Sequence, residues 1–171
     1  PALLPAARRL TGRREAPPVS ADAPQVSLVL LIDDEPTVRE ATAEMLRALG
    51  FEVLAAVDGP SGIEALRARG GEVAAVLLDV SMPGMGGEEA LAGLRRVRAD
   101  VRVVLVSGHD QAEIAERFAG RDIAGILQKP FGLAALETTL RAALDAPPPA
   151  GGGRPAGLRC RRARQDGRLR G

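Results

Sequence analysis

The sequence predicts an α/β fold, a doubly wound five-stranded parallel sheet with helices on both faces. Short apolar runs rich in β-branched residues alternate five times with segments whose apolar residues have helical spacing. This alternation is typical of strand–helix–strand units with parallel strands. The first, third and fourth runs are apolar almost throughout, as expected of strands buried on both faces. Because crossovers between parallel strands are right-handed, a three-layer open sandwich is the favoured topology.

The predicted strands are the five apolar runs, at residues 26–32, 52–56, 73–78, 101–106 and 123–128. The first predicted helix begins at Pro36 and ends before Gly50, and the second ends at Gly70 and Gly71, because glycine commonly stops a helix. The apolar stripes of the five helices contain, in chain order, Val38, Ala41, Met45, Leu46 and Leu49; Ile63 and Leu66; Ala90, Leu91, Leu94 and Val97; Ile114, Ala115 and Phe118; and Leu133, Leu136, Leu140, Ala143 and Leu144.

The composition divides the chain into one folded domain and two flanks. We expect residues 1–25 to be a flexible Pro/Arg-rich linker, residues 26–145 to be the domain, and residues 146–171 to be a disordered Pro/Gly/Arg-rich tail. The whole chain has a formal net charge of +1, but residues 26–145 contain 12 basic and 19 acidic residues. The Arg-rich tail has no aromatic residue for base stacking and no foldable pattern, so we expect neither direct nucleic-acid binding nor a further output domain there.

The composition also indicates the compartment. Cys160 is the single cysteine, so an internal disulfide is excluded and a reducing environment fits. No apolar run approaches the roughly 20 residues that a membrane helix needs, and no signal-peptide pattern is found. We expect a cytoplasmic segment without a membrane span.

Polar residues stand at the carboxyl ends of four predicted strands. The first strand is followed by Asp33, Asp34 and Glu35, and the third by Asp79. The fourth is followed by Ser107, and the fifth by Lys129. Because ligands of open α/β sheets bind beyond the carboxyl ends of the strands, these side chains should converge.

These residue types indicate phosphoryl chemistry with a metal ion. Three neighbouring carboxylates raise one another's pKa unless a cation compensates them, and hard oxygen ligands without a His or Cys pair favour Mg²⁺. Asp79 stands alone and is the candidate nucleophile, whereas the Asp33–Asp34 pair suits metal binding. Lys129 and Ser107 are suitable phosphate contacts. The chain has 22 Arg but one Lys, and a compact ammonium at Lys129 fits this role.

These residues give the sequence a family resemblance. The strings LIDDE at 31–35, LLDVSMPGMGG at 77–87, VSG at 106–108 and QKPF at 128–131 resemble the receiver domain of two-component response regulators. The likeness extends over the predicted domain, with all four site elements in order. It implies the flavodoxin-like (βα)₅ receiver fold with strand order 2-1-3-4-5.

The resemblance also implies roles for individual residues. Asp79 would be the phosphoacceptor, taking a phosphoryl group from the phosphohistidine of a histidine kinase. Mg²⁺ would be bound directly by Asp34 and Asp79, through water by Asp33, and by the backbone carbonyl of Ser81. Lys129 would pair with the phosphoryl oxygens, and its peptide bond to the following proline is often cis in the family.

The implied switch involves the fourth strand and the helix after it. Ser107 would move toward the phosphate and draw its loop along, altering the surface formed by the fourth helix, fifth strand and fifth helix for an unidentified downstream protein. Ile126 departs from the family pattern, because an aromatic residue commonly stands there. Such a domain is not a turnover enzyme beyond self-phosphorylation and slow autodephosphorylation. The sequence around Lys129 and the Pro-rich lead-in resemble the C-terminal receiver of a hybrid sensor histidine kinase, and a stand-alone regulator is the alternative.

Other interpretations remain for the same residues. Asp33 to Pro36 could form a helix N-cap, and Asp79 could be a turn residue. His109, the only histidine, could tune the lifetime of an aspartyl-phosphate or be an exposed loop residue.

Two other function classes are less favoured. A phosphohydrolase of the haloacid-dehalogenase type would need an acid at the position of Ser81. A flavodoxin-like cofactor binder would need a phosphate-cradling loop where Asp33, Asp34 and Glu35 stand.

Overall fold

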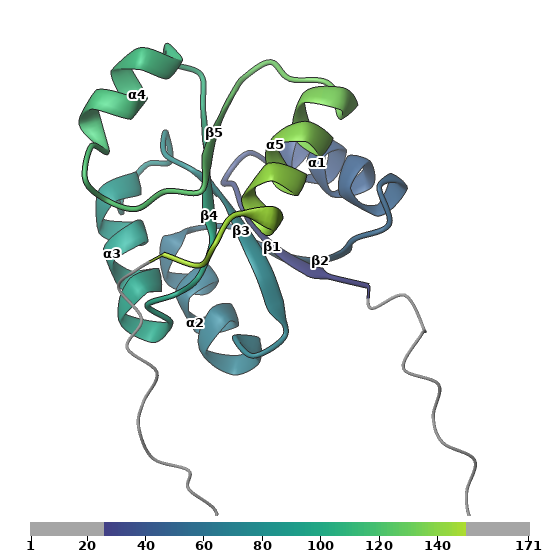
Figure 1. Ribbon diagram of the computed structural model, residues 1–171, viewed down its shortest axis with the longest axis horizontal. Coiled ribbons are helices and arrows are strands. Elements are labelled where there is room, and N and C mark those ends of the chain that lie inside the picture. Colours follow the sequence, from purple (N-terminus) through teal and green to yellow (C-terminus); the bar gives the residue numbers. More distant parts are fainter. Residues whose placement is uncertain (1–25, 150–171) are drawn as a thin grey trace, which may run out of the picture.

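A computed structural model describes residues 26–149, which form five alternating strands and helices (Figure 1). The strands make one parallel sheet of order β2-β1-β3-β4-β5. This confirms the predicted fold class and strand order. The elements in chain order are β1 (Leu28–Ile32), α1 (Pro36–Ala48), β2 (Glu52–Ala56), α2 (Gly59–Arg69), β3 (Val73–Asp79), α3 (Gly87–Val97), β4 (Val103–Ser107), α4 (Gln111–Arg117), β5 (Gly125–Gln128) and α5 (Leu133–Asp145).

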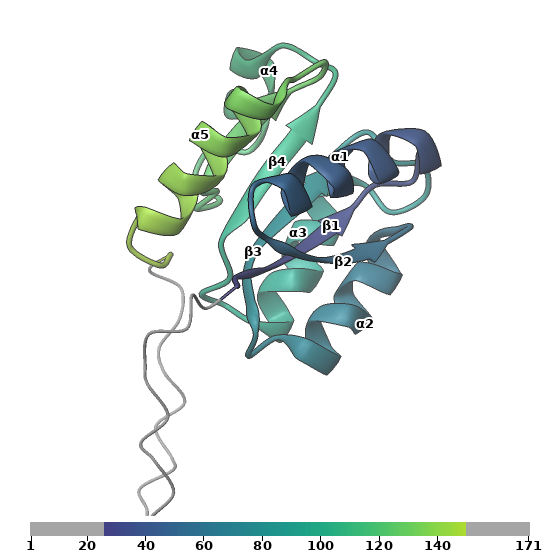
Figure 2. The same ribbon diagram turned by 90° about the vertical axis from the view of Figure 1, so that its right-hand side faces the viewer.

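The helices cover both faces of the sheet. Helices α1 and α5 lie on one face, in front of the sheet in Figure 2, and α2, α3 and α4 lie on the other. Alternate side chains of each strand enter two apolar clusters. In β1, Val29 and Leu31 pack with residues of α1 and α5, whereas Leu30 and Ile32 pack with residues of the opposite helices. Burial on both faces explains why this strand is continuously apolar.

Five strand boundaries differ from the prediction. Strand β1 begins at Leu28, and Val26 is exposed. Val101 is fully buried although β4 begins only at Val103, so its apolar character reflects packing and not strand pairing. Strand β5 likewise begins at Gly125 instead of residue 123. Strands β3 and β4 extend to Asp79 and Ser107, which places both residues on the rigid sheet.

The helix ends combine predicted and unpredicted signals. Gly50 follows α1 with a φ of 87°, the left-handed conformation that glycine adopts without strain. Helix α2 begins with a capping box in which Asp58 and Ser61 bond each other's backbone, and this box was not predicted. Within the described residues, every buried side-chain polar atom has a hydrogen-bond partner.

The flanks predicted at 1–25 and 146–171 lie outside the described residues, except for 146–149 after α5. The single cysteine, Cys160, also lies outside them. Over residues 26–149, none of the helices has the length and apolar character needed to cross a membrane.

Candidate functional site

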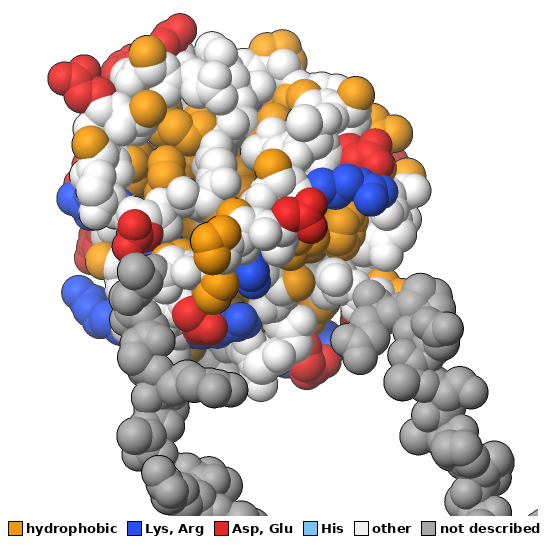
Figure 3. All heavy atoms as spheres, viewed as in Figure 1, with side chains coloured by type: hydrophobic (Ala, Val, Ile, Leu, Met, Phe, Trp, Pro, Cys, Tyr) orange, Lys and Arg blue, Asp and Glu red, His pale blue; other side chains and the backbone are white. Residues whose placement is uncertain are grey.

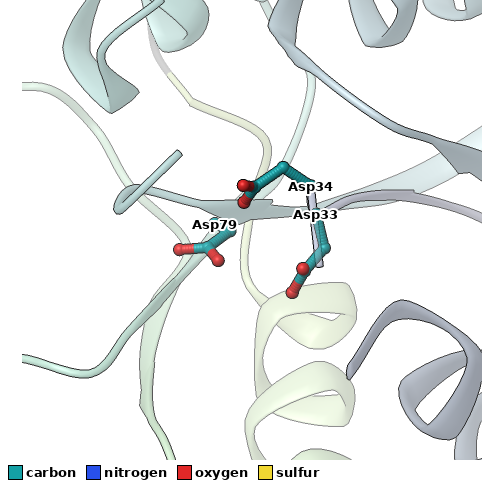
Figure 4. Close-up of side chains that lie close together, drawn as sticks. All are labelled: Asp33, Asp34 and Asp79. Carbon is teal, nitrogen blue, oxygen red and sulfur yellow. The ribbon is translucent and has the colours of Figure 1, made fainter. Parts of the chain in front are cut away.

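Three carboxylates gather at the carboxyl end of the sheet. Asp33 and Asp34 follow β1, and Asp79 ends β3 (Figure 4). One oxygen from each lies within 4.8 Å of the others. Asp33 and Asp79 are buried, 2% and 4% exposed, whereas Asp34 is exposed. The convergence predicted for these residues is therefore confirmed in the structure.

Lys129 joins two of the carboxylates. Its ammonium lies 2.9 Å from Asp33 Oδ2 and 2.7 Å from Asp79 Oδ2. Burial lowers the pKa of Lys129, but hydrogen bonds to Asp79 and Asp33 and the charges of both outweigh this effect, so its pKa lies above the ordinary value. Lys129 is therefore a fixed positive charge beside Asp79 at neutral pH.

The same local turn ends β1, β3 and β4. In each case the side chain of a residue at the strand end, or directly after it for β1, accepts a hydrogen bond from the backbone N–H two residues later. Asp33 Oδ1 accepts from Glu35 N at 2.9 Å, and Asp79 Oδ1 accepts from Ser81 N at 2.8 Å. Ser107 Oγ accepts from His109 N at 3.0 Å. Each turn fixes one side-chain oxygen of the site residue.

These turns bear on the two structural alternatives for the acids. Glu35 occupies the N-cap position of α1 with Pro36 in the first turn, as the N-cap interpretation expected, although Glu35 makes no side-chain capping bond. The turn interpretation of Asp79 accounts for Oδ1 only, since Oδ2 binds Lys129. Asp33 and Asp79 thus each combine a hydrogen bond from a nearby backbone N–H with a contact to the Lys129 ammonium.

Sheet pairing brings Ser107 and Lys129 next to Asp79. Val106, the residue before Ser107, is the register partner of Asp79. Val80 N donates a hydrogen bond to the carbonyl of Val106 at 3.0 Å. Lys129 N donates to the carbonyl of Ser107 at 2.7 Å. The bond from Lys129 to Pro130 is cis, as the family resemblance implied.

The donor set fits a divalent cation. Lys129 supplies one positive charge to three carboxylates, which leaves about two negative charges uncompensated when all are ionised. Carboxylates around an accessible edge are the ligands that Mg²⁺ prefers, and Asp34 is exposed to solvent there. The predicted ligands Asp33, Asp34 and Asp79 are thus together, and Ser81 adjoins them through its N–H bond to Asp79.

Comparison with known proteins decides the family. The sequence matches the response regulator receiver domain over residues 29–141. The chain belongs to this family. Receiver domains generally bind Mg²⁺ at an acidic pocket and interact with histidine kinases, and this receiver has an acidic cluster.

Relatives of this receiver occur in proteins of different architecture. The sensor kinase CckA of Brucella abortus is 36% identical over 117 residues, which cover 68% of this chain and 12% of the kinase. The probable transcriptional regulatory protein TcrX of Mycobacterium tuberculosis is 36% identical over 118 residues, covering 68% of this chain and 49% of the regulator. The chain therefore spans at most about half of these relatives.

Solved structures share the fold. The chemotaxis protein CheY4 of Vibrio cholerae superposes with a TM-score of 0.64 at 25% identity, covering 70% of this chain and 99% of that protein. The receiver domain from the hybrid histidine kinase CckA gives 0.58 at 28% identity, covering 68% and 98%.

Two polar contacts of the receiver were not predicted from the sequence. Arg39 of α1 donates from its guanidinium to the carbonyl of Asp33 at 2.7 Å. Gln111, the first residue of α4, donates from its side chain to the carbonyl of Ile126 at 3.1 Å. The only sequence signal for Arg39 was its place one turn into the helix that follows the acidic pair.

The side chain of His109 faces Glu113 of α4. Its side chain is exposed, and Nδ1 lies 3.8 Å from Glu113. Its role in the lifetime of an aspartyl-phosphate stays a hypothesis, which an unchanged dephosphorylation rate in His109→Ala would contradict.

A groove opens beside the site, between α1 and the loop after β5. Its volume is about 480 Å³, and its surface is mostly apolar. The lining residues are Thr37, Val38, Ala41, Thr42, Met45, Lys129, Pro130 and Phe131. Lys129 therefore borders both the acidic cluster and an apolar surface.

Proposed function

We propose that this receiver accepts a phosphoryl group on Asp79 from the phosphohistidine of a histidine kinase and thereby switches its α4–β5–α5 surface. The observation that carries the proposal is the setting of Asp79, a buried carboxylate 2.7 Å from the Lys129 ammonium and clustered with Asp33 and Asp34. A carboxylate in this setting can act as a nucleophile at phosphorus. The unit that performs this role spans residues 26–145, and we assign it to the cytoplasm.

The residues of the cluster divide the chemistry between them. A carboxylate oxygen of Asp79 attacks phosphorus, the P–N bond of the phosphohistidine breaks, and the imidazole leaves with the bonding electrons. Lys129 offsets the charge of the transferred phosphoryl oxygens. Mg²⁺ would be held by Asp34, Asp79 and the Ser81 carbonyl, and through water by Asp33, and when bound would supply further positive charge to the site.

Ser107 connects the reaction to α4. Its hydroxyl oxygen accepts from His109 N, while its hydroxyl proton remains available to a phosphoryl oxygen on the neighbouring strand. Movement of Ser107 toward that oxygen would weaken the bond to His109 and release the loop that leads to α4.

The affected surface is suited to a protein partner. Apolar side chains gather between α4 and β5 in Figure 3, where a groove is lined by Ala112 and Ala115 of α4 and by Ile123 to Ile126. Ile126 has no aromatic ring that could change its position when the domain switches. Its backbone carbonyl instead accepts a hydrogen bond from the side chain of Gln111, and this bond joins the start of α4 to β5. The downstream protein is unidentified.

The apolar groove between α1 and the loop after β5 is the surface that we assign to the phosphodonor. A phosphohistidine has to approach Asp79 from solvent, and this groove reaches the cluster at Lys129. Its apolar lining offers area for a protein contact that a small phosphodonor does not need.

We further propose that the chain is the receiver of a hybrid sensor histidine kinase, as its similarity to CckA suggests. The similarity to TcrX supports the alternative of a separate regulator. Sequence upstream of Pro1 tests this point, because a kinase ATP-binding domain there is expected only for the hybrid.

Intact mass after incubation with a small acyl-phosphate donor tests the chemistry. We expect the native chain to gain one phosphoryl group with Mg²⁺ and none with a chelator. Asp79→Asn should gain none, and the matched surface change Asp145→Asn should behave as native. Failure of the native chain with both the acyl phosphate and a competent phosphorylated kinase would overturn the proposal. Sustained turnover of a phosphate ester would instead support the phosphohydrolase alternative.

A further inference from the structure

Asp33 is held by four separate hydrogen bonds. Its backbone N–H donates to the carbonyl of Ala56 at 3.2 Å, which continues the pairing with β2. Its two side-chain oxygens accept from Glu35 N and from Lys129. Its backbone carbonyl accepts from the Arg39 guanidinium at 2.7 Å. Every polar group of this residue therefore has a fixed partner.

The bond from Arg39 closes the turn between β1 and α1. Strand β1 ends at Ile32, so the carbonyl of Asp33 lies one residue beyond the strand. Helix α1 begins without a side-chain cap at Glu35, and the first helical bond runs from Arg39 N to the carbonyl of Glu35 at 2.9 Å. Arg39 thus binds both Glu35 and Asp33, through its backbone and its side chain respectively. This ties the start of the helix to the end of the strand.

The orientation of Asp34 depends on that turn. Asp34 is exposed, and its backbone shares a peptide plane with the Asp33 carbonyl. A fixed Asp33 carbonyl therefore fixes the plane from which Asp34 extends toward Asp79. Because the guanidinium binds a backbone carbonyl, it occupies none of the carboxylate oxygens of the cluster.

We propose that Arg39 is a positioning residue for the cation site of this receiver, and that its bond to the Asp33 carbonyl sets the affinity for Mg²⁺. The inference rests on the proposed function only in taking the cluster as a Mg²⁺ site. Loss of an outer partner of a metal site commonly weakens metal binding by about 10–100-fold. Arg39 acts on the geometry of the ligands, so the reactivity of Asp79 at saturating Mg²⁺ should change little.

Calorimetric titration with Mg²⁺, without any phosphodonor, tests this role. Arg39→Gln removes the long guanidinium and should weaken binding by about 10–100-fold. Arg47→Gln is the matched control, because it removes the same charge from the exposed last turn of the same helix and should change the affinity less than about twofold. Folding of both variants is checked by circular dichroism and amide NMR spectra. A second variant, Arg39→Lys, keeps the charge and should recover only part of the affinity.

Four further outcomes separate the possible explanations. A Coulombic effect of Arg39 would fade at high ionic strength, whereas a positional effect persists. Equal Mg²⁺ affinity of folded Arg39→Gln and the native chain, or a difference that disappears at high salt, would overturn the inference. Phosphorylation of Arg39→Gln by acyl phosphate should approach the native rate at saturating Mg²⁺, and a rate that stays low there would contradict a role in metal positioning alone. Absence of Mg²⁺ binding by the native chain would overturn the proposed metal site as well.

Discussion

Asp33, directly after β1, and Asp79, at the end of the adjacent strand β3, share the ammonium of Lys129 through one carboxylate oxygen each, at 2.9 and 2.7 Å. The other oxygen of each is bound by a backbone N–H two residues later. Two buried carboxylates therefore depend on one cation. Removal of that cation should affect both at once.

Lys129→Ala should lower the free energy of unfolding of the metal-free chain at neutral pH by about 2 kcal/mol, because it leaves two desolvated carboxylates without their partner. Saturating Mg²⁺ should reduce the difference, since a divalent cation compensates the same carboxylates. Urea unfolding of both chains, with Mg²⁺ and with a chelator, measures the effect. A metal-free variant as stable as the native chain would contradict the shared pairing.

The raised pKa of Lys129 predicts how this contribution depends on pH. The folded pKa lies above the ordinary value of 10.5, so the ion pair stabilises the fold fully below about pH 10.5 and is lost as pH rises through the folded value. The stability difference between the native chain and Lys129→Met should therefore be constant from pH 7 to 9 and shrink in more alkaline solution. Urea unfolding at a series of pH values measures it. A difference that grows with pH would have the wrong sign.

The groove assigned to the phosphodonor gives a prediction that separates two donors. Ala41→Glu places a charge in the apolar lining and should slow phosphotransfer from a phosphorylated histidine kinase by about tenfold or more, the equivalent of about 1.4 kcal/mol. Phosphorylation by a small acyl phosphate should be unchanged, because that donor needs no groove. Both rates are measured by radiolabel transfer.

Ala48→Glu is the control, since it makes the same change at an exposed position of α1 outside the groove. Equal loss in both variants would indicate a general charge effect. Equal loss with both donors would indicate damage to the site itself.

Close packing beneath the site gives a stability prediction. A Cβ on Gly62 of α2 would lie 2.3 Å from Cδ1 of Ile32, the fully buried residue before Asp33. Gly62→Ala should therefore lower the free energy of unfolding by about 1–3 kcal/mol through overpacking, despite the better helix propensity of alanine. Gly71→Ala, where no atom lies within 4 Å of the added Cβ, should have little effect in the same urea experiment. A Gly62→Ala variant more stable than the native chain would show that the side chain of Ile32 can shift without lowering the free energy of unfolding.

The sequence was sufficient to predict the sheet order and the residues that meet at its edge. Asp33, Asp79, Ser107 and Lys129 each follow an apolar run, and the topology of parallel strands brings such positions together. The strand boundary near Val101 was wrong because burial and strand pairing select the same apolar residue types.

The side-chain hydrogen bonds of Arg39 and Gln111 around the site could not be predicted from the sequence. The bond from Arg39 to Asp33 depends on the direction and reach of a long side chain from α1, and the bond from Gln111 depends on where α4 lies against β5. Neither relation follows from the period of the apolar residues. Both depend on tertiary packing.

A change at Ser107 separates the phosphorylation of Asp79 from the effect of that phosphorylation on α4. Ser107→Ala removes the hydroxyl but none of the carboxylates, so Asp79 should still gain a phosphoryl group at a rate within about tenfold of native, consistent with the loss of one hydrogen bond worth about 1 kcal/mol. The amide NMR shifts of Ala112 and Ala115 on α4 should respond to phosphorylation in the native chain and much less in the variant. The side chain of His109 points to Glu113, so His109→Ala should retain the response. An undiminished response of the α4 amide shifts in Ser107→Ala would instead mean that another contact connects Asp79 to α4.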